Sequence, residues 1–161
     1  MYTITFLALV MYGCNTTNAV PNGYYDYDED KVIAAVEQLP FNPALPDFIP
    51  IHMVSVVSDV YKENEAEVMD LSFYTTENDL LTIKFTEADD FPNSWVKSEK
   101  LPITDQIDGI YEDNLFSKKL AWQKDDITYV MTYRANVSTE LNNEQRVTRQ
   151  QLVEVARSFH S

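Results

Sequence analysis

The chain has 161 residues, of which 45% are hydrophobic, and this composition is typical of a globular protein with one core. Its formal net charge of −14 argues against nucleic acid as a partner, because no basic stripe is present to displace counterions from phosphates. Anionic membrane surfaces would also repel it. The single cysteine, Cys14, excludes an internal disulfide framework and a cysteine-based zinc site.

The first 13 residues form a signal-like segment. Their apolar run, from Ile4 to Met11, is too short for a bilayer span of about 20 residues but has the length of a signal-peptide core. Residues 11–14 (MYGC) resemble the lipobox of bacterial lipoproteins, in which the cysteine is diacylated and becomes the mature N-terminus. The resemblance implies lipid attachment at Cys14 and a place on the extracytoplasmic face of the cell membrane. The alternative is a buried apolar segment with an ordinary free cysteine.

Residues 14–27 are expected to form a polar tether, and residues 28–161 a single folded domain. Pro21 and the Asn22-Gly23 pair break regular structure in the tether, and whether its three tyrosines pack on the domain is left open.

The stretch Asp26–Gln38 has two interpretations. Four of its acids have the spacing of EF-hand calcium ligands: Asp26, Asp28, Asp30 and Glu37. Lys31, however, occupies the position at which that loop needs glycine. Its apolar residues recur at helical spacing: Val32, Ile33, Ala35, Val36 and Leu39. We therefore predict a helix, with Asp26 and Glu29 as its capping box.

After this helix, residues 39–50 contain four prolines and predict an extended crossing segment. Five strands follow in the prediction: Ile51–Val60, Val68–Thr75, Leu80–Thr86, Trp95–Leu101 and Gln106–Glu112. With residues 76–78 as a three-residue turn, the second and third strands pair Met69 with Phe85, Leu71 with Ile83 and Phe73 with Leu81. Asn78 takes the left-handed position of that turn.

Residues 116–134 predict the central hairpin. With Lys124 and Asp125 as the turn, Trp122 lies opposite Ile127 and Leu120 opposite Tyr129. The same register places Lys118 opposite Met131 and Phe116 opposite Tyr133. A loop with an even number of residues keeps the large apolar side chains on one face, whereas an odd loop would mix the faces. The sheet is therefore expected to be buried on one side and solvated on the other.

The chain closes with a predicted helix over residues 142–159, in which Thr148 and Gln151 form a capping box. Its buried stripe is expected to contain Leu152, Val155, Ala156 and Phe159. We expect the helix to lie across the apolar face of the sheet, over Trp122 and Tyr129. The predicted fold class is α+β: an antiparallel sheet of about six or seven strands packed with an N-terminal and a C-terminal helix.

A family resemblance rests on three segments: LPFNPALPDFIP (39–50), KLAWQKDDITYVMTY (119–133) and TRQQLVEVARSF (148–159). They resemble a domain of unknown function that occurs in lipoproteins of Gram-positive bacteria. The same domain occurs in extracytoplasmic parts of anti-sigma-factor and sporulation-associated proteins. The family has glycine in the turn where this chain has residues 124–126 (KDD), so the turn type is left open. The resemblance carries no catalytic residue.

The sequence offers little catalytic equipment. His160 is expected to be solvated, and His52 to be structural or exposed. No G-x-S-x-G nucleophile motif and no glycine-rich phosphate loop is present. Carboxylate pairs are expected to be solvated loop tips, including Glu77 with Asp79 and Asp125 with Asp126. Several aromatic residues could line a groove, although the core is the favoured interpretation: Trp95, Trp122, Tyr111, Tyr129 and Tyr133.

These patterns predict a non-enzymatic, lipid-anchored extracytoplasmic protein, with no cofactor or metal, that binds or senses something at the cell envelope. Its partners would be the membrane, through Cys14, and an unidentified envelope protein. The alternative is a carrier that holds an apolar or lipid-like ligand in a cavity under the C-terminal helix. An open apolar cavity of at least ~300 Å³ there would favour the carrier. A third hypothesis is a hydrolase of envelope polymers, which a buried carboxyl with a shifted pKa in a cleft would favour.

Overall fold

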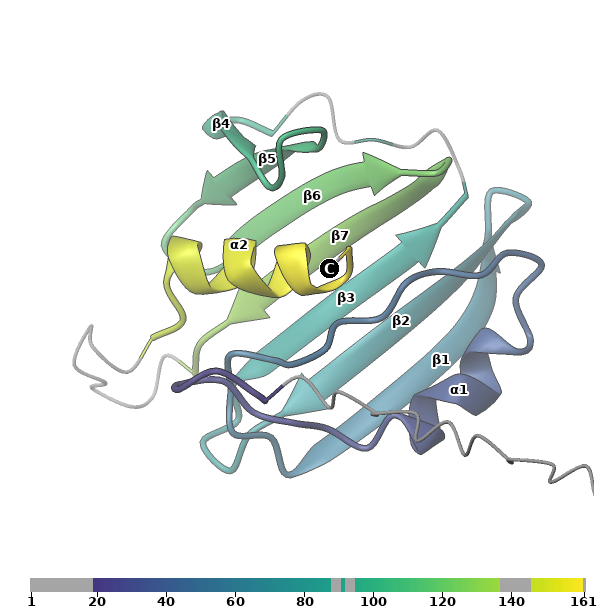
Figure 1. The fold of residues 1–161 in the computed structure, drawn as a ribbon, viewed down its shortest axis with the longest axis horizontal. Coiled ribbons are helices and arrows are strands. Elements are labelled where there is room, and N and C mark those ends of the chain that lie inside the picture. The colour runs from purple at the N-terminus through teal and green to yellow at the C-terminus, as the bar shows by residue number, and fades with distance from the viewer. Residues whose placement is uncertain (1–18, 88–90, 92–94, 137–145, 161) are drawn as a thin grey trace, which may run out of the picture.

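The computed structural model describes residues 19–87, 91, 95–136 and 146–160. They form one antiparallel sheet of seven strands with two helices, so the predicted α+β fold is confirmed. The strands are β1 Ser55–Glu63, β2 Ala66–Tyr74, β3 Leu80–Thr86, β4 Ser98–Pro102, β5 Asp108–Asp113, β6 Lys118–Lys124 and β7 Ile127–Arg134. Their order across the sheet is β1-β2-β3-β7-β6-β5-β4. Two meanders, β1–β3 and β4–β7, therefore join where β3 pairs with β7 (Figure 1).

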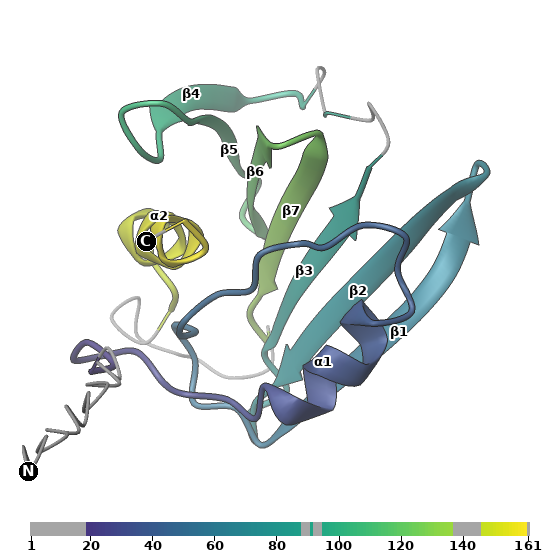
Figure 2. The same cartoon turned by 45° about the vertical axis from the view of Figure 1, so that its right-hand side comes forward.

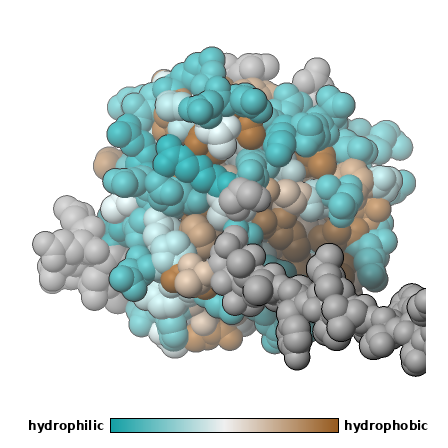
Figure 3. All heavy atoms as spheres, in the orientation of Figure 1, coloured by the Kyte–Doolittle hydropathy of each residue, from teal (hydrophilic) through white to brown (hydrophobic). Residues whose placement is uncertain are grey.

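Both helices lie on the same face of this sheet. Figures 1 and 2 show α2 (Arg149–Ser158) across β6 and β7, and α1 (Asp30–Val36) beside β1 and β2. The extended segment after α1 crosses the same face between them. Hydrophilic side chains cover much of the outer surface on this side (Figure 3). No helix of the described residues has the length and apolarity needed to cross a membrane.

The C-terminal helix closes the core as predicted. The side chain of Thr148 accepts a hydrogen bond from the backbone of Gln151, whose side chain bonds back to the backbone of Thr148, so the capping box is confirmed. The predicted stripe is buried: Leu152, Val155, Ala156 and Phe159. The Phe159 ring lies edge-on to Trp122, with ring centroids 5.1 Å apart, and edge-on to Tyr129 at 5.5 Å. The helix itself begins at Arg149, later than predicted, and residues 142–145 lie outside the described residues.

The hairpin of β2 and β3 has the predicted register. Met69 pairs with Phe85, Leu71 with Ile83 and Phe73 with Leu81. Asn78 has a φ of 63°, the left-handed conformation that asparagine tolerates. Alternation and turn chemistry pointed to the same pairing here, which is why the sequence was sufficient.

The register predicted for β6 and β7 is wrong by two residues. Trp122 pairs with Tyr129 and not with Ile127, and Lys118 pairs with Tyr133. The turn consists of Asp125 and Asp126, with φ of 51° and 63°, which are the two positive values of a type I′ turn. A shift of two residues keeps every side chain on its predicted face, so alternation could not distinguish the two registers.

This turn leads to a stability prediction. Asp126→Gly should raise the free energy of unfolding by about 1 kcal/mol, because glycine adopts positive φ without the penalty of a side chain. Urea denaturation of the variant and the parent measures the difference. Gln123→Gly, in the adjoining strand, is the control and should be destabilising, because glycine weakens a strand interior. Equal or lower stability of Asp126→Gly would contradict the turn assignment.

The first helix is shorter than predicted. It covers Asp30–Val36, and its N-cap is Glu29, with no side-chain capping bond, so the predicted capping box is wrong. Val32 and Ala35 are buried, whereas Ile33 is 43% exposed. Residues 24–27, which include the predicted cap residue Asp26, run along the extended segment instead: Tyr25 and Ile49 exchange two backbone hydrogen bonds of 2.8 and 2.9 Å. This pairing holds residues ahead of Asp30 in an extended conformation.

Several strand boundaries also differ from the prediction. The first strand begins at Ser55 and not at Ile51, because its partner β2 ends at Tyr74. In the next pair, β4 and β5 begin at Ser98 and Asp108.

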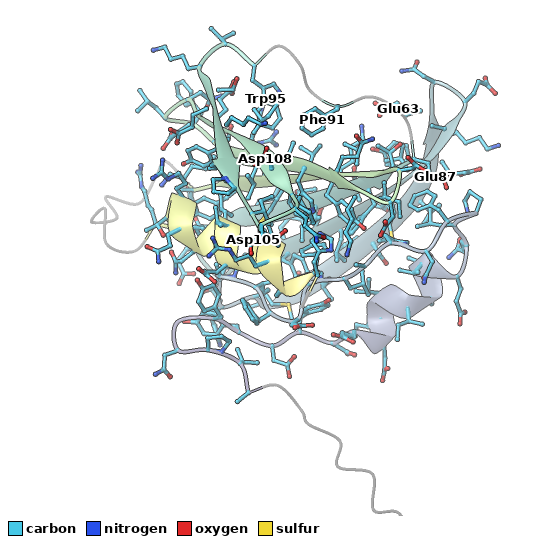
Figure 4. All side chains as sticks on the ribbon, turned by 45° about the horizontal axis from the view of Figure 1, so that its top comes forward. Glu63, Glu87, Phe91, Trp95, Asp105 and Asp108 are labelled. Atoms are coloured by element: carbon cyan, nitrogen blue, oxygen red, sulfur yellow. The ribbon has the colours of Figure 1, made fainter. Side chains whose placement is uncertain are left out.

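The second face of the sheet is not uniformly solvated: Val68, Ala121 and Thr128 are at most 1% exposed. Trp95 contributes to this face, with its ring centroid 5.4 Å from the Lys119 ammonium, and Figure 4 shows it on the β3–β4 connection with Phe91.

Candidate functional site

The N-terminal segment is fastened to the domain before the first helix begins. The Tyr27 hydroxyl donates a 2.8 Å hydrogen bond to the Pro46 carbonyl, and the Tyr24 ring packs against Phe48. The described part of the predicted tether therefore packs on the folded domain, and Tyr27 belongs to its core. Cys14, the predicted lipid attachment site, lies outside the described residues.

A cavity of about 420 Å³ lies where this segment meets the β2–β3 turn and the start of α2. Its lining combines both signs of charge with hydrogen-bonding groups: Gly23, Tyr25, Pro50, Ile51, His52, Thr75, Glu77, Asp79, Arg146, Val147 and Gln151. The volume is in the range of small-molecule sites in proteins, about 300–1,000 Å³. We call this hollow the Arg146 cavity.

Asp79 anchors one wall of the Arg146 cavity. The residue is only 7% exposed, and its carboxylate accepts hydrogen bonds from the Tyr133 hydroxyl at 3.2 Å and from the Asn136 backbone at 2.7 Å. Its backbone N–H donates to the Thr75 hydroxyl at 3.0 Å. Burial and the adjacent Asp79 carboxylate together raise the pKa of Tyr133 to about 12, so the phenol stays a donor. The expectation that Asp79 is a solvated loop tip is wrong, because the turn directs it under the end of β7.

Arg146 supplies the positive charge. Its Nε atom is buried and has no hydrogen-bond partner in the described part of the chain. A buried N–H without an acceptor costs about 1–3 kcal/mol, so native structures rarely retain one without a reason. Arg146 also borders a second hollow of about 240 Å³, together with Lys118 and Tyr133. Arg146 therefore borders two hollows, and its buried Nε–H has no acceptor among the described residues.

Glu77 and His52 complete the rim. The Glu77 side chain is exposed, and hydrogen bonding, chiefly from Thr76, lowers its pKa, so it is ionised at neutral pH. The exposed His52 ring lies edge-on to Tyr25, with centroids 5.2 Å apart. The lining of the cavity thus includes the anionic Glu77 and the cationic Arg146.

Sequence reasoning missed Arg146 and misplaced Asp79. Arg146 stands two residues before the capping box of Thr148, and an arginine there has no pattern that separates it from a solvated one. Asp79 follows the turn residue Asn78, where acids are normally exposed. A weak signal was available, since Tyr133 is the last aromatic on the buried face of β7 and its hydroxyl needs a partner.

The aromatic residues do not form a groove. The side chains of Trp122, Tyr111, Tyr129 and Tyr133 are at most 6% exposed and belong to the core, as favoured. Trp122 and Tyr129 stack with an interplanar angle of 2°. The fifth residue, Trp95, points to the other face of the sheet.

His160 is not the solvated terminal residue that was expected. Its Nε2 atom accepts a 2.9 Å hydrogen bond from the indole N–H of Trp122, and its Nδ1 atom is buried without a partner among the described residues. Burial lowers its pKa, because it disfavours the imidazolium, and the charge of Lys124 acts in the same direction. Asp125 opposes this shift. The end of the chain is therefore held on the core by a neutral imidazole.

This contact predicts a pH dependence of stability. A pKa lowered by folding means that the unfolded state binds the proton more tightly. The stabilisation is complete above about pH 6.5 and is lost as the pH falls, by at most about 1.4 kcal/mol per pH unit.

Urea denaturation at about pH 7.5 and 5.5 checks this linkage. The wild type should lose more stability between the two values than His160→Gln does. The only other histidine, His52, is exposed, so His52→Gln is a matched control that should keep the wild-type dependence. Equal pH dependence of His160→Gln and the wild type would refute the linkage.

Two other hollows are weaker candidates for a ligand site. The first, of about 450 Å³, is bordered by Lys100 and Asp108, which already pair at 2.7 Å. The second, of about 320 Å³, is bordered by Asp70, whose pKa is raised by burial while the Tyr61 hydroxyl donates to it at 2.9 Å. A carboxyl with a raised pKa is a candidate general acid, but a hydrolase also needs a second positioned carboxyl or base. The residue paired with Asp70 across the sheet is Lys84, which is neither.

No cluster of three or more His, Cys, Asp or Glu side chains in the described residues has an arrangement suited to a metal ion. The Arg146 cavity is bordered by a buried donor that has no acceptor in the described part of the chain. Comparison with protein-family models, with curated proteins and with solved structures found no match to this chain.

Proposed function

We propose that this protein is a non-enzymatic, lipid-anchored extracytoplasmic binding module that holds a small polar ligand in the Arg146 cavity. The observation that carries the proposal is the buried, unpaired Nε–H of Arg146 beside a cavity of about 420 Å³. A ligand oxygen would remove the cost of that unpaired donor, and a charge-assisted bond is among the stronger hydrogen bonds.

The cavity favours a ligand with charges of both signs. Arg146 would bind an acidic group, and the ionised Glu77 side chain at the rim would bind an amine. The Asp79 carboxylate already accepts hydrogen bonds from Tyr133 and Asn136, so its role is structural. Glu77 is then the carboxylate that would bind the ligand amine. An amino acid or a short peptide has this chemistry and fits the volume.

The carrier hypothesis receives less support from the packing. Aromatic rings fill the space beneath α2: Phe159 contacts Trp122, Tyr129 and Phe85, with centroids 5.1, 5.5 and 6.3 Å away. The Arg146 cavity lies at the start of α2 and is lined by charged groups, which suit a polar ligand better than a lipid-like one. The partner protein at the envelope remains part of the proposal without an assigned surface.

Titration of a dipeptide panel by calorimetry tests the ligand class. Alanyl-alanine should bind saturably, and its N-acetylated and C-amidated forms should each bind at least about tenfold more weakly, because each lacks one charge. Arg146→Met should abolish binding, whereas Arg134→Met should not, since that exposed arginine lies outside the cavity. Absence of saturable binding across the panel, or equal binding to Arg146→Met, would refute the assignment.

The same variant carries a stability prediction. Arg146→Met should raise the free energy of unfolding of the ligand-free protein by about 1–2 kcal/mol, because it replaces an unpaired buried donor with an apolar side chain. Thermal or urea denaturation measures the change. Arg157→Met is the control and should be destabilising, because the Arg157 side chain donates 2.6 Å hydrogen bonds to the Ile103 carbonyl and to Glu154. A loss of stability in Arg146→Met would identify it as a structural residue.

A further inference from the structure

Three large apolar side chains are displayed to solvent at one end of the sheet. Val96 is 92% exposed, Leu115 is 89% exposed and Phe116 is 75% exposed. Leu115 and Phe116 form the turn between β5 and β6, and Val96 lies just before β4. The central-hairpin prediction that Phe116 lies opposite Tyr133 is therefore wrong, because the strand begins at Lys118. We call these three residues the apolar tip.

The turn holds its side chains outward by hydrogen bonds. The Asp113 carboxylate accepts from the Leu115 backbone at 3.1 Å, and the Asn114 side chain accepts from the backbones of Phe116 and Ser117 at 3.2 and 2.9 Å. Leu115 has a φ of 71°, which is unfavourable for a bulky residue. The side chains of Leu115 and Phe116 both stay exposed, so packing within the domain does not explain the strained backbone of Leu115. Strained, exposed apolar residues are typical of a contact with something outside the chain.

The apolar tip lies at the end of the sheet near which the described N-terminal residues line a cavity. Leu115 and Phe116 border the hollow of about 240 Å³ that Arg146 also borders. Gly23, from the N-terminal segment, lines the Arg146 cavity as well. The N-terminal segment, the cavity and the apolar tip are thus contiguous along one end of the molecule. Ala19 is five residues after Cys14, a distance of at most about 18 Å in an extended chain.

We propose that the apolar tip inserts into the interfacial region of the lipid bilayer to which Cys14 anchors the protein. This inference rests on the proposed lipid anchor, which places that end of the sheet at the membrane. Phenylalanine and leucine on an exposed turn are suited to the boundary between headgroups and acyl chains. The exposed Lys97 flanks the tip and can reach a lipid phosphate while its stem stays apolar, whereas the Lys118 ammonium donates to the Val147 carbonyl at 2.8 Å. Insertion would hold the mouth of the Arg146 cavity close to the membrane surface.

Quenching by brominated phosphatidylcholine tests insertion without requiring acylation. Phe116→Trp is placed in the full chain with Cys14→Ser, and its emission is compared with that of the same chain without the new tryptophan. We expect added emission that is blue-shifted and quenched by bromines near the headgroups. Tyr61→Trp, on β1 towards the other end of the sheet, is the matched control and should add unquenched emission. Unquenched emission from Phe116→Trp overturns the proposal. A partner protein bound at the apolar tip in place of lipid would overturn it as well.

A second variant measures the contribution to binding. Leu115→Ser with Phe116→Ser should weaken binding to phosphatidylcholine vesicles about tenfold, because two apolar side chains no longer enter the bilayer. Its melting temperature should stay within about 2 °C of the parent, since both side chains are exposed. Unchanged vesicle binding by the double variant overturns the proposal. If the apolar tip fails these tests while Cys14→Ser still releases the protein from membranes, the anchor stands and only the insertion is wrong.

Discussion

Trp122→Ala is expected to lower the free energy of unfolding by about 3–5 kcal/mol, a large share of the stability of a domain of this size. The Trp122 side chain is fully buried and stacks on Tyr129 at 5.1 Å, with Phe159 edge-on to it at the same distance. Its indole N–H is the donor to His160. Truncation therefore leaves a cavity between the sheet and α2 and also releases the end of the chain.

Urea denaturation followed by circular dichroism measures this loss. The other tryptophan, Trp95, is the matched control. It is half-buried on the opposite face and contacts Lys119, so Trp95→Ala should cost about 1 kcal/mol or less. Equal effects of the two substitutions would mean that α2 does not depend on the Trp122 stack.

Cys14→Ser is expected to move the protein out of the membrane fraction of its native host. The lipobox-like residues 11–14 predict diacylation of Cys14, and two acyl chains hold a protein firmly, whereas one holds it weakly. The net charge of −14 makes the folded domain a poor binder of anionic lipid, so the anchor would supply most of the membrane affinity.

Fractionation of the host and mass spectrometry of the mature N-terminus check this expectation. The wild type should begin at an acylated Cys14 and sediment with membranes. The variant should be found in the medium or as unprocessed precursor. Met11→Leu, which makes the motif more like a lipobox, is the control and should remain anchored. A wild-type protein that is soluble in the cytoplasm with Met1 intact would refute both the anchor and the compartment.

The β2–β3 hairpin and the capping box of α2 could be predicted because their signals are local. Asn78 suits a left-handed turn, and Thr148 lies three residues before Gln151. The register of β6 and β7 could not be predicted to the residue. Lys124-Asp125 and Asp125-Asp126 both make two-residue turns, and both keep the apolar face intact.

The sequence by itself determined the fold class, the apolar faces of the β2–β3 and β6–β7 hairpins and the stripe of α2, because these follow from periodicities of two and 3.6 residues along the chain. Tertiary structure alone decided the side-chain partners of His160 and Asp79 and the burial of the Arg146 Nε atom. Trp122 lies 38 positions from His160, and Tyr133 lies 54 positions from Asp79. Burial and hydrogen bonding depend on which distant segments meet, and an isolated polar residue carries no periodicity that reports this meeting.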